Sequence, residues 1–333
     1  MGRNGRTVDV VIPTRGETPW LAESLASVAA QTLAPAGVIL VDDGLEKPAD
    51  VAALGERLFG GRFRLLPNRG RGISAALNTA IQNSSAIWIA RMDADDLAHP
   101  ERLQRQVDFL AASPDVMLGC GTQARFINAA GKFLALSSMP ESWEDVGSRL
   151  LAQTCFIHPS LMIQREALVA TPYRSALDGA EDVDLVLRLA ERGRIVNDSA
   201  VLLDYRIHLT QESFRQRARA TAIQELAFRL AACRQKTGRD PLDCSMDLAE
   251  AFIGWRLATP GYIRARTSLT ALRYAGLNLS GRDFGGLAAC LGVALRSFPA
   301  TPAAWRIAWR VYRKAGAALL DTETPFEALN IRT

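Results

Sequence analysis

Three carboxylates in the middle of the chain have the spacing of a divalent-metal site. Asp93, Asp95 and Asp96 come directly after an apolar segment. That segment, residues 86–90, is too short for a typical helix and contains Ile and Trp, which indicates a buried strand. Clustered carboxylates raise one another's energy unless a cation neutralises them, and oxygen ligands favour Mg²⁺ or Mn²⁺ over zinc. The alternative is that Asp95 or Asp96 only caps a helix that begins near Pro100.

Polar turns also follow three other predicted strands, which are expected over residues 8–12, 38–41 and 63–66. In an open α/β sheet, such turns lie at the edge where ligands bind. The turn residues are Pro13, Thr14 and Arg15, then Asp42, Asp43 and Gly44, then Asn68, Arg69, Gly70, Arg71 and Gly72. Arginines suit phosphate oxygens, and a carboxylate can accept a hydrogen bond from a base or a ribose. Each turn alone could be ordinary chain reversal, but together they describe a site for a nucleotide diphosphate and a divalent ion.

Strand-like and helix-like segments alternate over the first two hundred residues. Helical spacing is found at residues 20–31, 73–81, 100–112 and 181–192, and further strands are expected at 116–127, 133–136 and 195–207. Strands separated by segments of helix length imply an α/β fold with a mostly parallel sheet covered by helices. Strand patterns almost vanish from residue 211. We therefore expect an α/β domain over residues 1–208 and a helical C-terminal region over residues 209–333.

Composition and missing motifs exclude several classes of protein. The apolar fraction of 48% and charged fraction of 22% are those of a soluble globular protein. The five Cys are scattered and form no C-x-x-C pair, which argues against a disulfide framework or a zinc ribbon and for a reducing compartment. Neither a P-loop nor a dinucleotide-binding glycine motif is present. No signal peptide and no segment long enough to span a bilayer is found, so a cytoplasmic protein is expected.

Charge is divided unevenly along the chain. Residues 209–333 hold 18 basic and 10 acidic side chains, a net charge of +8, which leaves a net charge of −4 for residues 1–208. This division argues against nucleic acid as a partner, whereas the basic half suits an anionic surface. Within residues 305–320, Trp305 and Trp309 lie one helical turn apart beside several arginines. The segment is expected either to contact an anionic membrane or to pack against the rest of the protein.

The ordered motifs resemble those of family 2 glycosyltransferases, which have the GT-A fold. The resemblance covers residues 8 to about 208. It rests on residues 10–14, 41–44, 68–78, 91–96 and 180–185. Two places differ from many relatives, because Arg15-Gly16 stands where Tyr-Asn is common and Leu45 where Ser is common. Both places lie near the expected base pocket, so the identity of the nucleoside stays open.

The resemblance implies a role for each motif. Asp93 and Asp95 form the family's Asp-x-Asp motif, with Asp95 as a direct metal ligand, and Asp182 occupies the position of the catalytic base. His158 and His208 lie in segments that resemble active-site loops. His208 is expected to bind the metal or the diphosphate, unless it is only a hinge. The nucleotide sugar is expected to contact Pro13, Thr14, Arg15, Asp42, Asp43, Gly70, Arg71, Asn78 and Asp93.

The chemistry of such a site is the transfer of a sugar from a nucleotide diphosphate. The anomeric C–O bond breaks through an oxocarbenium-like state, and Mg²⁺ or Mn²⁺ stabilises the charge that the departing diphosphate gains. The acceptor hydroxyl must lose a proton, which the Asp182 carboxylate can take. Asp182 could instead be only a favourable charge at a helix N-terminus. Asp184 is expected to point away from the site, at the surface.

The expected protein is a metal-dependent, inverting glycosyltransferase that acts in cell-surface polysaccharide synthesis. Its expected donor is a nucleotide-diphosphate sugar, with a UDP-sugar favoured, and its acceptor is a saccharide or is lipid-linked. It would act in the cytoplasm, peripherally at the inner face of the cytoplasmic membrane. Two alternatives are a sugar-1-phosphate nucleotidyltransferase and a non-catalytic nucleotide-sugar-binding protein. The intact Asp93, Asp95 and Asp182 favour an enzyme.

Overall fold

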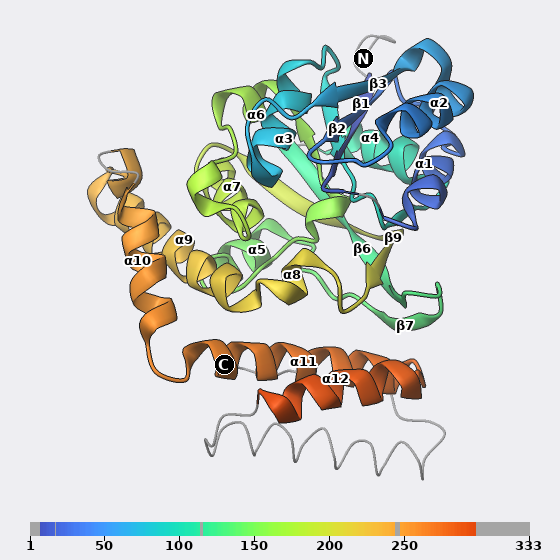
Figure 1. Ribbon diagram of the computed structural model, residues 1–333. Helices are drawn as coiled ribbons and strands as arrows, with labels where there is room; N and C mark the ends of the chain where they lie inside the picture. The colour runs from blue at the N-terminus through green and yellow to red at the C-terminus, as the bar shows by residue number, and fades with distance from the viewer. Residues whose placement is uncertain (1–6, 17, 114–115, 244–246, 298–333) are drawn as a thin grey trace. The chain divides into compact units, whose positions relative to one another are not determined.

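A nine-stranded sheet is the centre of the fold, with strand order β3-β2-β1-β4-β8-β6-β9-β5 and β7 paired to β6 (Figure 1). The computed structural model describes residues 7–16, 18–113, 116–243 and 247–297. By contacts the chain divides into two compact units, Met1–Ala258 and Thr259–Thr333, and the sheet belongs to the first. Among the described helices, none is both long enough and apolar enough to cross a membrane.

The first half of the sheet is parallel, as the alternation of strands and helices predicts. Its strands are β1 Val8–Thr14, β2 Gly37–Asp42, β3 Phe63–Pro67 and β4 Trp88–Arg91. The connecting helices are α1 Leu21–Ala29, α2 Pro48–Phe59 and α3 Gly72–Gln82. Pro13 does not end the first strand, because it pairs with Val41 and the strand continues to Thr14. The four strands therefore all end at one edge of the sheet.

The second half of the sheet is mixed. Its strands are β5 Leu97–Ala98, β6 Met117–Asn128, β7 Phe133–Leu136, β8 Met162–Gln164 and β9 Arg194–Ile207. Strand β8 lies antiparallel between β4 and β6, while β6 and β9 are parallel. The short β5 pairs antiparallel with β9, and Leu97 lies opposite Asp204. This last pairing brings the end of β9 beside the carboxylates that follow β4.

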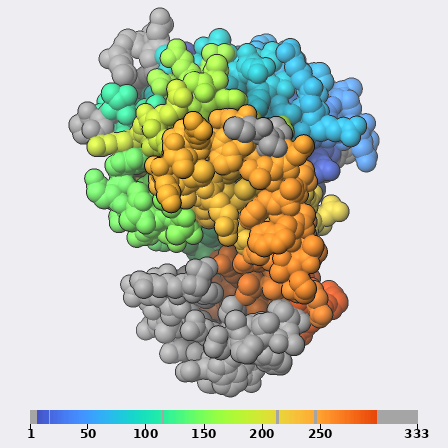
Figure 2. Space-filling model, turned by 90° about the vertical axis from the view of Figure 1, so that its left-hand side faces the viewer, coloured from blue at the N-terminus to red at the C-terminus, as the bar shows by residue number. Residues whose placement is uncertain are grey.

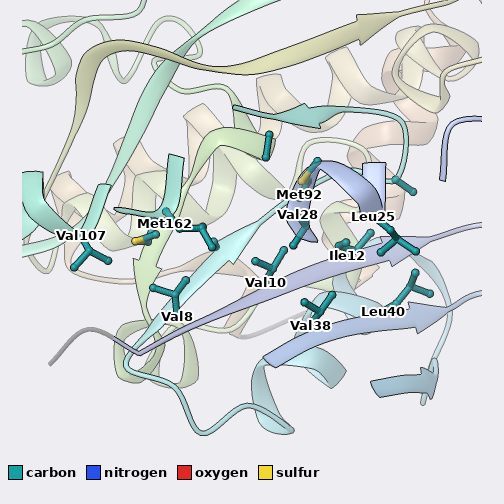
Figure 3. Close-up of a cluster of buried hydrophobic side chains, with 14 of the residues drawn as sticks. Val8, Val10, Ile12, Leu25, Val28, Val38, Leu40, Met92, Val107 and Met162 are labelled. Carbon is teal, nitrogen blue, oxygen red and sulfur yellow. The ribbon is translucent and has the colours of Figure 1, made fainter. Parts of the chain in front are cut away.

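The two faces of the parallel strands are covered by different helices. Val8, Val10 and Ile12 of β1 belong to one core cluster with side chains of α1, α2 and α4 (Figure 3). Val11, between them, belongs to a second cluster with side chains of α3, α6 and α7. This alternation follows from the period of two in a strand. Both faces of β1 are buried, so its residues are mostly apolar, with Asp9 as the buried exception.

The remaining helices of the first unit cover the sheet and extend beyond residue 208. They are α4 Arg102–Ala112, α5 Trp143–Arg149, α6 Arg165–Ala170, α7 Glu181–Ala190, α8 Glu212–Arg215, α9 Arg217–Thr237 and α10 Asp247–Ala258. Apolar side chains of α7, α9 and α10 share a third core cluster. In Figure 2 the yellow and orange side chains of these C-terminal helices lie directly against the green part of the unit. Contacts thus divide the chain after Ala258, fifty residues beyond the boundary expected from the sequence.

The described part of the second unit is a helical hairpin of α11 Tyr262–Ser280 and α12 Phe284–Arg296. The Asp283 side chain caps α12 by accepting a hydrogen bond from the Gly286 backbone N–H. These helices agree with the helical C-terminal region that the sequence predicts. The amphipathic segment 305–320 lies outside the described residues.

Candidate active site

Three carboxyl groups meet directly after β4. Asp93, Asp95 and Asp96 each offer an oxygen, and these atoms lie within 4.8 Å of one another. The Asp96 side chain is fully buried and accepts a hydrogen bond of 2.8 Å from the Arg206 backbone N–H. Its second oxygen has no hydrogen-bond partner in the part of the chain that the structure describes. An all-oxygen donor set with a buried, unsatisfied carboxylate oxygen fits Mg²⁺ or Mn²⁺.

His208 lies against this cluster, as the resemblance implies. Its Nε2 atom is 2.9 Å from Asp95 Oδ2, and its Nδ1 atom is 2.7 Å from the Thr210 hydroxyl. The imidazole ring also packs on Trp20, with 4.5 Å between ring centroids. Residues 113 positions apart in the chain therefore meet at one carboxylate. The His208 ring is held on two sides and could contribute a nitrogen ligand beside Asp95.

Arg206 is a further residue of this site, and the sequence interpretation missed it. Its side chain is buried, with Nε donating to the Asp95 carbonyl at 2.8 Å and Nη2 to Glu23 at 2.8 Å. Its guanidinium also lies over the Trp20 ring, 5.2 Å from the centroid. Arg206 thus ties the backbone of the Asp-x-Asp segment to α1 and β9. The only sequence signal was a charged residue near the end of the predicted strand 195–207, two positions before His208.

Asp93 is paired within the protein rather than free. Its Oδ1 atom lies 2.5 Å from Nη2 of Arg91, the last residue of β4. Burial raises the pKa of Asp93, and the charges of Asp95 and Asp182 raise it further, whereas Arg91 lowers it. Burial likewise raises the pKa of Asp96 well above its usual value, with Asp95 and Asp93 adding to the effect. The three carboxyl groups thus outnumber the one guanidinium beside them, as expected of a site that binds a cation.

The turns after β1, β2 and β3 are joined by hydrogen bonds into one surface. The Thr14 carbonyl accepts from the Asp43 backbone N–H at 2.9 Å. The Asp43 carboxylate accepts from the Asn68 amide at 2.9 Å and from the Gly72 backbone N–H at 3.3 Å. Asp42 accepts from two backbone N–H groups of its own turn. The structure therefore brings Thr14, Asp42 and Asp43 together, as predicted from strand ends that share an edge.

Gly72 begins α3 in a backbone conformation that only glycine adopts readily, with φ of +83°. A Cβ atom there would lie 2.0 Å from Asp178 Oδ2. Asp178 itself accepts a hydrogen bond from the Ser74 backbone N–H at 3.1 Å, at the start of α3. The glycine thus allows the loop before α7 to approach the third turn, which places that loop beside the edge where β1 to β4 end.

The other residues predicted to contact the nucleotide sugar fall into two groups, those at the surface of the turns and one inside the fold. Arg15, Gly70 and Arg71 are exposed along the same turns, and Pro13 is half-buried. Asn78 on α3 is engaged inside the fold, because its amide donates to the Tyr173 carbonyl at 2.9 Å and accepts from the Tyr173 backbone N–H at 3.0 Å. The exposed groups can reach a ligand without rearrangement, whereas Asn78 holds the chain at Tyr173.

Asp182 lies in the first turn of α7 and lines a recess with mostly apolar walls. The recess also includes His158, Phe156 and Val186. Burial raises the pKa of Asp182, while the nearby Arg91 charge lowers it. A half-buried carboxylate in an apolar recess, close enough to Asp93 to influence its pKa, has the setting of a general base.

Glu181, His158 and Tyr173 form a buried polar chain next to Asp182. His158 Nε2 lies 2.8 Å from the Tyr173 hydroxyl, and His158 Nδ1 lies 3.8 Å from Glu181 Oε1. Glu181 also accepts from the Gly179 backbone N–H at 2.8 Å. Burial raises the pKa of Glu181 to about 8, with the Asp182 charge adding to it, and burial lowers the pKa of His158 well below its usual value. Both shifts favour the uncharged form of the group.

Asp184 was expected at the surface, and the structure shows that this was wrong. Its side chain is fully buried and pairs with Arg174 and with Arg188, whose Nε donates to Asp184 Oδ2 at 2.9 Å. Arg174 also donates to Asp240 at 2.8 Å. The sequence of α7 suggested an exposed polar face at Asp184. Arg174 and Asp240, which complete the buried network, lie outside α7, so the pattern within the helix does not reveal them.

Comparison with known proteins agrees with this geometry. Residues 9–169 match the family described as Glycosyl transferase family 2. The O-antigen biosynthesis glycosyltransferase WbnJ of Escherichia coli is 34% identical over 139 residues, which span 41% of this chain and 54% of the relative. A protein of Bacillus subtilis named as glycosyltransferase EpsE is 28% identical over 240 residues, 70% of this chain and 84% of the relative. The chain thus matches about half of the first relative and most of the second.

Solved structures show the same fold at low sequence identity. S. aureus TarS 1-349 in complex with UDP-GlcNAc superposes with a TM-score of 0.53 and 15% identity, covering 85% of this chain and 90% of that one. The mannosyltransferase PcManGT from Pyrobaculum calidifontis, in complex with GDP-Man and Mn²⁺, gives 0.51 and 20%, covering 94% and 80%. The fold is of the GT-A type, as the sequence predicts. Together, the family match and the relatives identify residues 9–169 as a glycosyltransferase domain of family 2.

Proposed function

We propose that the protein is a divalent-metal-dependent, inverting glycosyltransferase that uses a nucleotide-diphosphate sugar. One observation carries the proposal most directly. Three carboxyl groups and His208 converge at the sheet edge where four parallel strands end, and Asp182 enters the same region from α7. This arrangement provides a cation site and a base on one surface, which is what sugar transfer from a diphosphate needs.

The metal would be held by Asp93, Asp95 and His208, with Asp95 as the direct carboxylate ligand. Bound Mn²⁺ or Mg²⁺ supplies charge stabilisation for the departing diphosphate. Asp93 is fixed by Arg91, and the Asp95 backbone is fixed by Arg206. The ligand oxygens are thus positioned by neighbouring side chains before any ligand arrives, which reduces the ordering cost of binding.

The nucleotide would lie along the turns that follow β1, β2 and β3. Thr14 and Asp43 are already ordered by hydrogen bonds between these turns, and Asp42 by those of its own turn. The exposed Arg15 and Arg71 lie where they can pair with phosphate oxygens. We therefore propose that the nucleoside contacts the part of this surface that carries Asp42 and Asp43.

Asp182 is proposed to act as the general base. The acceptor hydroxyl passes its proton to the Asp182 carboxylate while its oxygen forms a bond to the anomeric carbon. The bond from that carbon to the diphosphate oxygen breaks on the opposite face, so the anomeric configuration inverts. The apolar walls around Asp182 exclude water from this step, which protects the donor from hydrolysis.

The relatives support the proposed donor class and setting. The similar TarS structure is a complex with UDP-GlcNAc, and the similar mannosyltransferase is a complex with GDP-Man and Mn²⁺. The E. coli relative is named for O-antigen biosynthesis. We accordingly propose a UDP-sugar donor, a saccharide or lipid-linked acceptor in cell-surface polysaccharide synthesis, and action in the cytoplasm at the inner face of the membrane. The segment proposed for membrane contact, 305–320, lies outside the described residues.

The test is incubation with UDP- and GDP-sugars, with and without Mn²⁺, followed by measurement of nucleoside diphosphate and pyrophosphate. Asp95→Asn should lower metal-dependent release of nucleoside diphosphate by at least about a hundredfold, the scale of losing one electrostatic stabiliser. Asp108→Asn, a change to an exposed carboxylate on α4, is the matched control and should leave release unchanged. Formation or consumption of pyrophosphate would instead support a nucleotidyltransferase, and near-normal release by Asp95→Asn would refute the metal assignment.

A further inference from the structure

Arg91 is a buried arginine whose burial does not stabilise the fold in an evident way. Only 5% of the residue is exposed, and its Nη2 atom pairs with Asp93. Its Nε and Nη1 atoms are buried and have no hydrogen-bond partner among the residues that the structure describes. Burying an ionised group costs several kcal/mol unless its hydrogen-bonding groups are satisfied. A guanidinium left partly unsatisfied is thus a cost to stability, which points to a role at the site.

Arg102 shows what a structural arginine looks like in the same core. It is 1% exposed and lies on α4, close to the end of β4. Its Nε donates to the Gln106 side chain at 3.1 Å, and its Nη2 donates to the Arg91 carbonyl at 2.8 Å. These bonds fasten α4 to the sheet, and none reaches a carboxylate of the site. The two buried arginines therefore differ in their partners rather than in their burial.

The charge of Arg91 acts on both sides of the site. It lowers the pKa of Asp93, of Asp182 and of Glu181, and each of these groups is raised by burial. The guanidinium is thus close enough to the carboxylates of the metal cluster and to those at the start of α7 to lower the pKa of both. Within the described part of the chain, Arg91 forms one direct ion pair, that with Asp93, so its effect on the metal cluster is expected to pass through that side chain.

We propose that Arg91 is a positioning residue that holds the Asp93 carboxylate at the spacing from Asp95 that a divalent cation needs. Three clustered carboxylates repel one another in the absence of metal, and one ion pair with a rigid donor fixes the first of them. The planar guanidinium orients a carboxylate in a way that the ammonium group of lysine does not reproduce. This inference rests on the metal site of the proposed function and deepens it, because it assigns to Arg91 the spacing between the Asp93 and Asp95 carboxylates.

The test is a double-mutant cycle on Mn²⁺ affinity, measured with the metal alone by electron paramagnetic resonance of free Mn²⁺. Arg91→Met should weaken Mn²⁺ binding about tenfold or more, the usual effect of removing the partner of a metal ligand. Asp93→Asn should also weaken it. The variant with both changes should match Asp93→Asn within about twofold, because Arg91 acts through Asp93. If the two effects multiply instead, Arg91 does not act through Asp93 and the proposal is overturned.

Arg102→Met is the matched control for loss of a buried arginine. It should lower the melting temperature while leaving Mn²⁺ affinity within about twofold of wild type, since its bonds serve α4. If Arg91→Met does not fold, Arg91→Lys takes its place in the cycle and should still lose Mn²⁺ affinity. Unchanged affinity in the folded Arg91 variant, with Mn²⁺ binding by wild type intact, overturns this inference alone. Wild type that binds no Mn²⁺, with or without nucleotide, overturns the proposed metal site as well.

Discussion

At the scale of single residues, burial of like charges changes the pKa of the acidic groups of the site. Burial raises the pKa of Asp93, Asp96, Glu181 and Asp182. For all of these except Asp182, neighbouring carboxylates raise the pKa further. Arg91 is the basic group that opposes this effect throughout. A site with this excess of acid is stabilised when a divalent cation enters, so metal binding and folding stability should be linked.

The role of Asp182 can be separated from donor binding. Asp182→Asn keeps the shape of the side chain but removes the proton acceptor, so turnover should fall by roughly 10²–10⁴-fold, the usual contribution of general-base catalysis. Affinity for the nucleotide should stay within about threefold of wild type, because the turns that face the nucleotide do not include Asp182. Steady-state kinetics and nucleotide titration measure the two quantities. Loss of nucleotide affinity in step with turnover would assign Asp182 to the donor instead.

Glu181 should make stability depend on pH. Its pKa is about 8 in the folded protein, above the ordinary value of 4.5, so the folded state binds the extra proton between these values. Its stabilising contribution is present below pH 4.5 and is lost as pH rises through 8. Glu181→Gln keeps a neutral side chain at every pH. The melting temperature of this variant minus that of wild type should therefore increase from pH 5 to pH 9, and a constant difference would contradict the assigned pKa.

At the scale of elements, α7 is held in place by a buried ion-pair network. Asp184 on α7 pairs with Arg174 from the preceding loop and with Arg188 one turn later. Asp240, which follows α9, pairs with Arg174 and with Arg234 of α9. The network joins α7, the loop before it and α9. Since Asp182 lies two residues before Asp184 on α7, its position depends on α9, which follows the sheet.

Asp184→Asn should be strongly destabilising, because it leaves Arg174 and Arg188 partly buried without their carboxylate. Removing one partner of a buried pair commonly costs about 3–5 kcal/mol in free energy of unfolding. Glu250→Gln is the matched control, since it removes a carboxylate from the exposed pair with Arg219 and should cost no more than about 1 kcal/mol. Denaturant unfolding of both variants measures the difference. Equal, small losses would show that the Asp184 network does not stabilise α7.

At the scale of the whole molecule, helices α9 and α10, which follow residue 208, belong to the first unit. Leu177 and Leu187 share a core cluster with Ile223 and Leu230 of α9. The first unit, which ends at Ala258, contains every described residue that we assign to the site. The second unit begins at Thr259 and contributes none of them.

Two truncated chains test where the functional unit ends. A chain that stops after Ala258 keeps the shared core and the Arg174–Asp240 pair, so it should fold and bind nucleotide with Mn²⁺ within about threefold of the full chain. A chain that stops after residue 208 exposes the α7 side of that core and should melt at a much lower temperature or aggregate. Melting curves and nucleotide titration measure both. A stable, binding-competent chain of 208 residues would support the boundary expected from the sequence.

The sequence by itself determined what depends on neighbouring residues. Runs of apolar residues and polar turns predicted β1 to β4 and their shared edge, since strand length, periodicity and turn chemistry are local properties. Because the ends of parallel strands meet at one edge, the sequence also placed Asp43 and Asp93 on one surface. The helix of residues 48–59 was not predicted, although its Pro48 start is a favourable N-terminal signal.

Only the tertiary structure decided which distant side chains meet. The antiparallel pairing of β5 with β9 brings His208 to Asp95, although the two residues are 113 positions apart. Asp184 is buried because Arg174 and the helices after residue 208 cover it, and no periodicity within α7 reveals those partners. The ion pair of Arg91 with Asp93 is likewise invisible in the motif, which gives residue types but not the direction of side chains. Pairing between segments far apart in the chain is set by the free energy of the whole core, so local patterns cannot specify it.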